Sequence, residues 1–240
     1  IGELAGEIKE DDENVTFSKE FQLESGMKRV RIAFPWSVAS NLVALELDEG
    51  AKIIPVEKSL KMLMFGDSIT QGYDAMQPEN AYAVKVAELL NAEARNKGIG
   101  AERFFPKLAL MKYNMEPDII TVAYGTNDWS GSAKDEFEEA CREFYTNLRY
   151  TYPNAKIIAL APAWRVGINK ERPMGEPLKY IGEYMEKLSE NISNMTVIDC
   201  IDFIPHEAEN FRKDGVHPVD EGFKHYGKNL GNAILSKINF

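Results

Sequence analysis

The pattern of hydrophobic and polar residues changes at about residue 58. From Pro55 onward, short apolar runs alternate with segments of helical periodicity. This order is typical of a parallel sheet covered by helices on both faces. Five runs are predicted to be strands, over residues 61–65, 92–96, 118–124, 156–161 and 196–200. The sequence therefore predicts an α/β domain with a five-stranded parallel sheet over residues 59–240.

Helical periodicity is clearest near the C-terminus and just after the first predicted strand. Near the C-terminus, apolar residues recur every three or four positions: Phe223, Tyr226, Leu230, Ile234 and Ile238. Between residues 80 and 93 a second apolar face contains Ala83, Val86, Ala87 and Leu90. Both stripes predict helices that pack one face against the core.

The first 58 residues follow a different pattern. Val30, Ile32 and Phe34 alternate with other residues, and a second alternation runs over residues 43–48. A period of two is typical of half-buried strands, in this case antiparallel ones. We expect residues 1–58 to form a small β-rich segment, which could be part of a β-sandwich.

The net charge and the length of the apolar runs exclude some classes of binding partner. The 240 residues include 38 acidic and 28 basic ones, which gives a net charge of −10. Because phosphate binding relies on clustered Lys and Arg, this charge disfavours nucleic acid as a partner. The longest apolar runs, such as residues 157–163, are too short to cross a bilayer. We expect an ordinary globular protein.

The two cysteines and the acidic residues near the fifth predicted strand suggest neither a disulfide framework nor a metal site. Cys141 and Cys200 are expected to be reduced thiols. Asp199 and Asp202 have no His or Cys cluster beside them that would complete a zinc site. A cytoplasmic location is favoured, and a secreted form whose signal peptide has been removed stays open, as does the oligomeric state.

Three separate segments supply groups suited to catalysis. Gly66-Asp67-Ser68 leaves the first predicted strand and enters a turn that opens a helix, and Gly125-Thr126-Asn127-Asp128 follows the third strand. Asp214-Gly215-Val216-His217 lies near the C-terminus. In an open parallel sheet, the loops after the carboxyl ends of the strands converge. We expect these segments to meet there.

The residue types fit nucleophilic catalysis. The Ser68 hydroxyl needs a base that titrates near neutral pH, and His217 is such a group. Asp214 precedes it by three residues and could hold one ring nitrogen while the other faces Ser68. His206 and His225 lie in segments that we expect to be surface or structural.

The three blocks, in this order and spacing, resemble those of the SGNH (GDSL) hydrolases, and the resemblance covers roughly residues 59–240. It implies a three-layer α/β/α flavodoxin-like fold. It also implies a serine hydrolase with the triad Ser68, Asp214 and His217, which needs no metal or organic cofactor. The implied oxyanion donors are the amide of Ser68, a backbone amide at Gly100 or Ala101, and the Asn127 side chain. The family usually has glycine at the place that aligns with Ala101.

The residues around these blocks suggest a substrate site. Tyr73, Trp129 and Trp164 follow the serine turn, the Asn block and the fourth strand, and Asp67 adjoins the serine. They are candidates for substrate binding. The positions of the three aromatic residues are explained equally well if their rings pack against the sheet edge. The position of Asp67 is explained equally well if its side chain caps the turn.

Three functions remain in consideration. The favoured one is hydrolysis of small O-acyl esters, with acetyl groups on carbohydrate suggested by related enzymes in which a β-sandwich precedes the catalytic domain. The second is lysophospholipid or thioester cleavage. The third is a non-catalytic carbohydrate-binding protein on the same fold.

Overall fold

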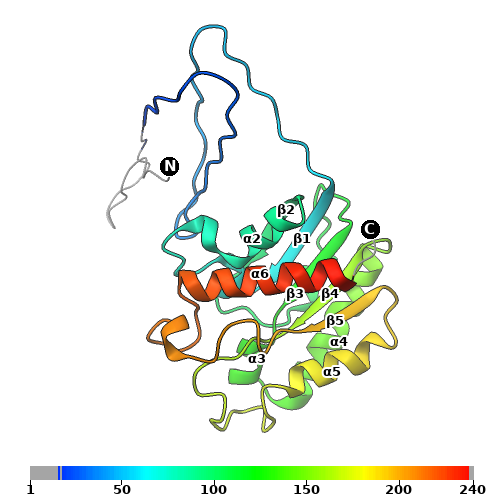
Figure 1. Cartoon of the computed structure of the whole chain (residues 1–240). Helices are drawn as coiled ribbons and strands as arrows, with labels where there is room; N and C mark the ends of the chain where they lie inside the picture. Colours follow the sequence, from blue (N-terminus) through cyan, green and yellow to red (C-terminus); the bar gives the residue numbers. More distant parts are fainter. Residues whose placement is uncertain (1–15, 17, 238–240) are drawn as a thin grey trace. The chain divides into compact units, whose positions relative to one another are not determined.

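The computed structural model describes residue 16 and residues 18–237 (Figure 1). The chain divides into two compact units, residues 1–32 and residues 33–240. All helices and strands of the described residues lie in the second unit.

A parallel sheet forms the centre of the second unit. Its strands are β1 (Leu60–Gly66), β2 (Ala92–Gly98), β3 (Ile119–Ala123), β4 (Lys156–Ala161) and β5 (Met195–Asp199). They pair in the order β2-β1-β3-β4-β5, and every pair is parallel. All five predicted strands are confirmed. This is the flavodoxin-like order, in which the chain reverses direction across the sheet between β1 and β3 and sites form beyond the carboxyl ends of those strands.

Helices cover both faces of the sheet (Figure 1). They are α1 (Ser68–Gln71), α2 (Tyr82–Leu89), α3 (Thr126–Gly131), α4 (Lys134–Thr151), α5 (Tyr180–Ser189) and α6 (Asp220–Lys237). Short 3₁₀ turns lie at η1 (Pro78–Asn80), η2 (Pro106–Leu110) and η3 (Ala208–Asn210). Helices α2 and α6 pack against each other over one face, and α4 and α5 cover the other. The predicted C-terminal helix is present as α6, and Ile238 of its predicted apolar face lies outside the described residues. The predicted helix between residues 80 and 93 is present as α2.

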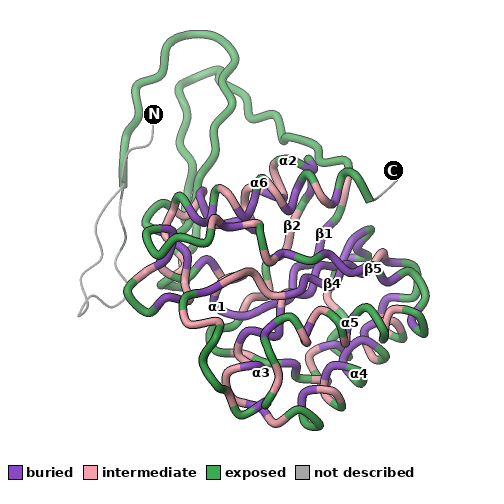
Figure 2. Tube along the Cα trace, turned by 60° about the horizontal axis from the view of Figure 1, so that its bottom comes forward, coloured by how far each residue is buried: buried purple, intermediate pink, exposed green. Residues whose placement is uncertain are grey.

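The alternation of side chains along β1 explains the two layers. Met62 and Met64 belong to the hydrophobic cluster under α2 and α6, whereas Leu63 and Phe65 belong to the cluster under α4 and α5. Successive side chains of a strand point to opposite faces. Since both faces are covered, residues 62–65 of β1 form a continuous apolar run with almost no exposure, and the central strands are drawn as buried in Figure 2.

The described part of the N-terminal segment differs from the expected β-rich unit, and residues 1–15 and 17 of that prediction lie outside the described residues. Residues 18–59, all described, contain no strand and no helix. Val30, Ile32 and Phe34, whose alternation suggested a strand, are about half exposed or more. A period-two pattern identifies a face that could be buried but supplies no partner strand, and an isolated strand or hairpin is marginal at best. The boundary near residue 58 stays a prediction.

One further expectation concerns membranes. Across residue 16 and residues 18–237, no helix combines the length and the apolar character that spanning a bilayer requires.

Candidate active site

The turn after β1 presents Ser68. Asp67 caps helix α1, with its Oδ1 accepting from the Ile69 backbone N at 2.9 Å. A Cβ on Gly66 would lie 2.0 Å from Thr70 Oγ1, so a side chain at position 66 would collide with the helix that follows. The glycine lets the strand turn directly into α1, which places Ser68 at the first helical position beyond the sheet edge.

Ser68, His217 and Asp214 form a continuous hydrogen-bonded series. Ser68 Oγ lies 2.7 Å from His217 Nε2, and His217 Nδ1 lies 2.6 Å from Asp214 Oδ2. The other carboxylate oxygen, Oδ1, accepts from the backbone N atoms of Val216 at 2.7 Å and of His217 at 3.0 Å. Three hydrogen bonds therefore fix the carboxylate, and the carboxylate fixes the imidazole.

The loop that carries His217 is held close to the segment after β4. Gly215 has a φ of +72°, and a Cβ there would lie 2.6 Å from the Val166 Cβ. The Val166 backbone N donates to the Gly215 carbonyl O at 2.9 Å. This close approach positions the Asp214–His217 loop beside the nucleophile turn.

The carboxyl groups of the site have different electrostatic surroundings. Partial burial would raise the pKa of Asp214, but the hydrogen bonds from His217 and two backbone amides outweigh it, and the pKa is lowered. Burial raises the pKa of Asp67 to about 7, and the nearby Asp128 adds to this, although the Ile69 amide opposes it. Burial likewise raises the pKa of Asp128 to about 6. Of these three carboxyl groups, Asp214 is therefore the one whose surroundings stabilise the charged form.

Asn127 lies next to the nucleophile turn. Its Nδ2 donates to the Glu102 carbonyl O at 3.0 Å and to Asp67 Oδ2 at 3.4 Å. The second of these bonds is long. The amide therefore lies beside the residue that precedes Ser68, as the convergence of strand ends predicts.

The end of β2 and the loop after it lie against the nucleophile turn. The Ile99 backbone N donates to the Gly66 carbonyl O at 3.0 Å, and Asn96 Nδ2 donates to the Thr70 carbonyl O at 2.6 Å. Ala101 has a φ of +60°, in the left-handed region that favours glycine. The backbone conformation here therefore supports the alignment of Ala101, rather than Gly100, with the usual glycine of the family.

The aromatic candidates lie in three different environments. The Tyr73 ring centroid is 4.6 Å from that of His217. Trp164 stacks on His206 at 5.0 Å and lines a small cavity. Trp129 is 1% exposed, and its Nε1 donates to the Glu176 carbonyl O at 2.8 Å. Of the two alternatives for Trp129, packing into the core agrees with this burial, and a substrate contact does not.

Trp36 was missed by sequence reasoning. Its ring centroid lies 4.5 Å from that of Tyr73. Trp36 belongs to no recognisable motif, and it lies in residues 1–58, for which the sequence predicts a separate β-rich segment. The ring is therefore close to the catalytic candidates although it precedes them by more than 30 positions in the sequence.

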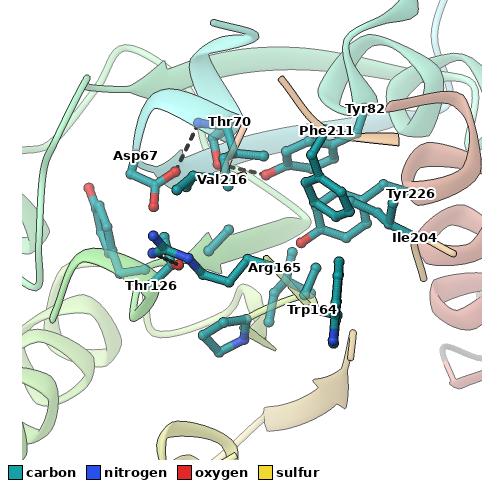
Figure 3. Close-up of a pocket in the computed structure, with 16 residues that line it drawn as sticks. Asp67, Thr70, Tyr82, Thr126, Trp164, Arg165, Ile204, Phe211, Val216 and Tyr226 are labelled. Atoms are coloured by element: carbon teal, nitrogen blue, oxygen red, sulfur yellow. Dashed lines mark hydrogen bonds between the residues drawn. The ribbon is translucent and has the colours of Figure 1, made fainter. Parts of the chain in front are cut away.

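A small cavity lies behind the nucleophile turn (Figure 3). Its volume is about 30 Å³, room for one or two water molecules. Its wall includes Asp67, Thr126, Trp164 and Arg165, and Figure 3 shows the Arg165 guanidinium lying between Asp67 and Thr126. Arg165 Nη1 donates to Thr126 Oγ1 at 3.1 Å and to Ser130 Oγ at 3.0 Å.

Arg165 is a second residue that sequence reasoning missed. It is 9% exposed. Burial, and then the nearby Arg172, lower the pKa of its guanidinium, and the carboxylates of Asp214 and Asp67 only partly oppose this. A single Arg after a strand carries no distinctive signal in a sequence. Its guanidinium ties the segment after β4 to α3, next to Asn127.

The remaining sequence candidates lie apart from this arrangement. His206 Nε2 is 3.1 Å from Asp202 Oδ1, and His225 Nε2 is 3.9 Å from Glu221 Oε1. Cys141 and Cys200 are both buried free thiols. Within the part of the chain that the structure describes, no three His, Cys, Asp or Glu side chains gather as a metal site would require.

Comparison with known proteins identifies the family. Residues 64–225 match the GDSL-like Lipase/Acylhydrolase family. The chain belongs to this family. It is therefore a GDSL-type acylhydrolase, a serine hydrolase, as the resemblance of the three sequence blocks predicted. No curated protein matches the chain.

Solved structures share the fold. A Bacteroides ovatus protein provisionally named a GDSL-like lipase is 25% identical, with a TM-score of 0.63 over 76% of this chain and 55% of its own. A family 2 carbohydrate esterase with a carbohydrate-binding domain from Corynascus thermopiles is 16% identical, with a TM-score of 0.62 over 78% and 68%. A family two carbohydrate esterase from Cellvibrio japonicus is 19% identical, with a TM-score of 0.61 over 76% and 62%. This chain thus spans about half of the Bacteroides ovatus protein.

Proposed function

We propose that this GDSL hydrolase cleaves small O-acyl esters, with acetyl groups on carbohydrate as its substrate class, through an acyl-enzyme on Ser68. The observation that carries the proposal is the hydrogen-bonded series from Ser68 Oγ through His217 to Asp214, with distances of 2.7 Å and 2.6 Å. A serine hydroxyl in contact with an oriented imidazole is the arrangement that nucleophilic acyl transfer needs.

The reaction follows from this geometry. His217 Nε2 accepts the proton of the Ser68 hydroxyl as Oγ attacks the ester carbonyl carbon. The tetrahedral intermediate collapses when the C–O bond to the alcohol breaks and the imidazolium returns its proton to the leaving oxygen. Water then attacks the acyl-enzyme by the same proton route and releases the carboxylic acid and free Ser68. Asp214 stays ionised throughout and stabilises the imidazolium.

The oxyanion of both intermediates needs preorganised donors. We assign them to the backbone N of Ser68, the backbone N of Ala101 and the side-chain amide of Asn127. The left-handed conformation of Ala101 supports its choice over Gly100. The 3.4 Å bond from Asn127 to Asp67 is long, so one amide proton is available to a developing negative charge. Each such donor lowers the barrier by about 3 kcal/mol.

The cavity behind the nucleophile turn has a volume of about 30 Å³ and is lined by Asp67 and Thr70, which flank the turn. It would not hold a long alkyl chain, which supports a short acyl group. Carbohydrate as the alcohol is supported by the fold relatives from Corynascus thermopiles and Cellvibrio japonicus, which are carbohydrate esterases by name. The alternative, lysophospholipid or thioester cleavage, requires that long chains lie on the surface instead. A purely carbohydrate-binding role would not require the hydrogen bonds that join Ser68, His217 and Asp214.

The test is a series of p-nitrophenyl esters from acetate to octanoate. We expect the wild type to prefer acetate and Ser68→Ala to lose at least about a thousandfold in kcat. Ser236→Ala, an exposed serine in the last turn of α6, is the matched control and should keep full activity. Equal activity in Ser68→Ala would overturn the catalytic assignment. A preference for octanoate would favour the long-chain alternative.

A further inference from the structure

Trp36 stands out within the N-terminal segment. Of residues 18–59, all of which the structure describes, every one is exposed except Trp36 and Ser40. Trp36 packs against the hydrophobic cluster under α2 and α6, and its ring centroid lies 4.5 Å from that of Tyr73 at an interplanar angle of 48°. The segment before β1 therefore contributes one large aromatic side chain to the surface beside Ser68.

Tyr73 connects Trp36 to the catalytic candidates. Its ring centroid lies 4.6 Å from that of His217, at an interplanar angle of 46°. Its backbone N donates to the Ser68 carbonyl O at 2.9 Å. Three rings thus follow one another from the segment before β1 to the imidazole that contacts Ser68 Oγ.

Two contacts anchor the Tyr73 turn to the loop that carries His217. Arg212 Nε lies 3.4 Å from Asp74 Oδ2, and the Met76 backbone N donates to Asp220 Oδ1 at 2.8 Å. The turn and the histidine loop are therefore tied on both sides of the ring contact. A preformed aromatic surface binds a ligand with little loss of conformational freedom.

The two rings are available to a ligand. Tyr73 is 37% exposed, and Trp36 is partly exposed. The side chains of Asp74 and Arg212 beside them are 27% and 38% exposed. An apolar ring surface bordered by charged hydrogen-bonding groups matches a pyranose ring, which has an apolar face of C–H groups and a rim of hydroxyls. An alkyl chain would gain nothing from the charged border.

We propose that Trp36 and Tyr73 form a stacking platform for the sugar ring of the alcohol part of the substrate. The proposal rests on the proposed function, because it places the acyl group at Ser68 and the sugar outside, against the platform. It makes Trp36 a specificity-determining residue and gives the segment before β1 a role in substrate selection.

The test compares two acetate esters that differ in the alcohol. Acetate release from methyl 6-O-acetyl-glucopyranoside and from ethyl acetate is followed by titration, and the ratio of their kcat/KM values is compared between variants. Removal of a stacking ring is expected to lower this ratio about tenfold in Trp36→Ala, chiefly through a higher KM for the sugar ester. Trp36→Phe should restore most of the ratio. Val38→Ala, an exposed apolar residue of the same segment, is the matched control.

The outcomes separate the platform from other roles of Trp36. An equal loss with both esters would show that Trp36 only supports the fold or the His217 ring, and would overturn the proposal. Unchanged kcat/KM values with both esters would overturn it as well. Selective loss with ethyl octanoate rather than with the sugar ester would make the surface an acyl-chain site instead.

A binding measurement distinguishes failure of the platform from failure of the proposed function. In Ser68→Ala, which cannot turn over, tryptophan fluorescence is titrated with the same acetylated glucoside. Saturable quenching that is lost in Ser68→Ala/Trp36→Phe supports the platform even if no ester is hydrolysed by the wild type. Absence of quenching, or quenching that survives in the double variant, overturns it.

Discussion

The buried carboxyl of Asp67 makes the stability of this protein depend on pH in an unusual direction. Asp67 is 1% exposed, and its pKa is raised from 3.8 to about 7, first by loss of water and then by the nearby Asp128. The Ile69 amide partly opposes the shift. We predict that Asp67→Asn stabilises the protein, because Asn keeps an acceptor for that amide and has no charge to desolvate.

The magnitude follows from the size of the shift. Above pH 3.8 the unfolded chain releases the Asp67 proton, while the folded protein keeps it until about pH 7. The contribution of Asp67 to stability is therefore greatest below pH 3.8, and it falls by about 1.4 kcal/mol for each pH unit as the pH rises towards 7. The accumulated cost is about 2 kcal/mol at pH 5 and about 4 kcal/mol at pH 8. Asp67→Asn removes it.

The assay is urea unfolding of wild type and variant at pH 5 and pH 8, followed by tryptophan fluorescence. The stabilisation by Asp67→Asn should be about 2 kcal/mol larger at pH 8 than at pH 5. Asp48→Asn removes the same charge from an exposed position before a turn and should show no such difference. If Asp67→Asn changes the unfolding free energy equally at both pH values, the carboxyl is ionised in the folded protein and the reasoning is wrong.

Three further predictions concern the site and the core. Asp214→Asn should lower kcat by about three to four orders of magnitude, because an amide cannot fix the His217 tautomer as the carboxylate does. A loss of less than tenfold in steady-state kinetics would contradict the triad. Ala101→Gly should raise the unfolding free energy by up to about 1 kcal/mol, since glycine tolerates a φ of +60°, and a lower denaturation midpoint would argue against a strained backbone. Burial raises the pKa of the Cys141 and Cys200 thiols, so neither should react with a disulfide reagent at pH 8 until denaturant is added; rapid labelling of the native protein would refute their burial.

The sequence determined the elements and the chemistry of this protein. Continuous apolar runs predicted five strands because both faces of a parallel sheet are buried. The proximity of Ser68, Asn127 and His217 was predictable because each follows a strand or lies in a late loop; their roles in one reaction stay a prediction. Glycine in Gly66-Asp67-Ser68 signalled the tight turn that the structure contains.

Tertiary structure decided what depends on contacts between distant segments. The strand order, the burial of Trp129 and the contact between Trp36 and Tyr73 each involve partners that no local pattern specifies. The N-terminal alternation shows the same limit, because a period of two marks a face and leaves the partner strand undetermined. Sequence patterns report how one segment is built, whereas packing between segments depends on shapes that exist only after the chain has folded.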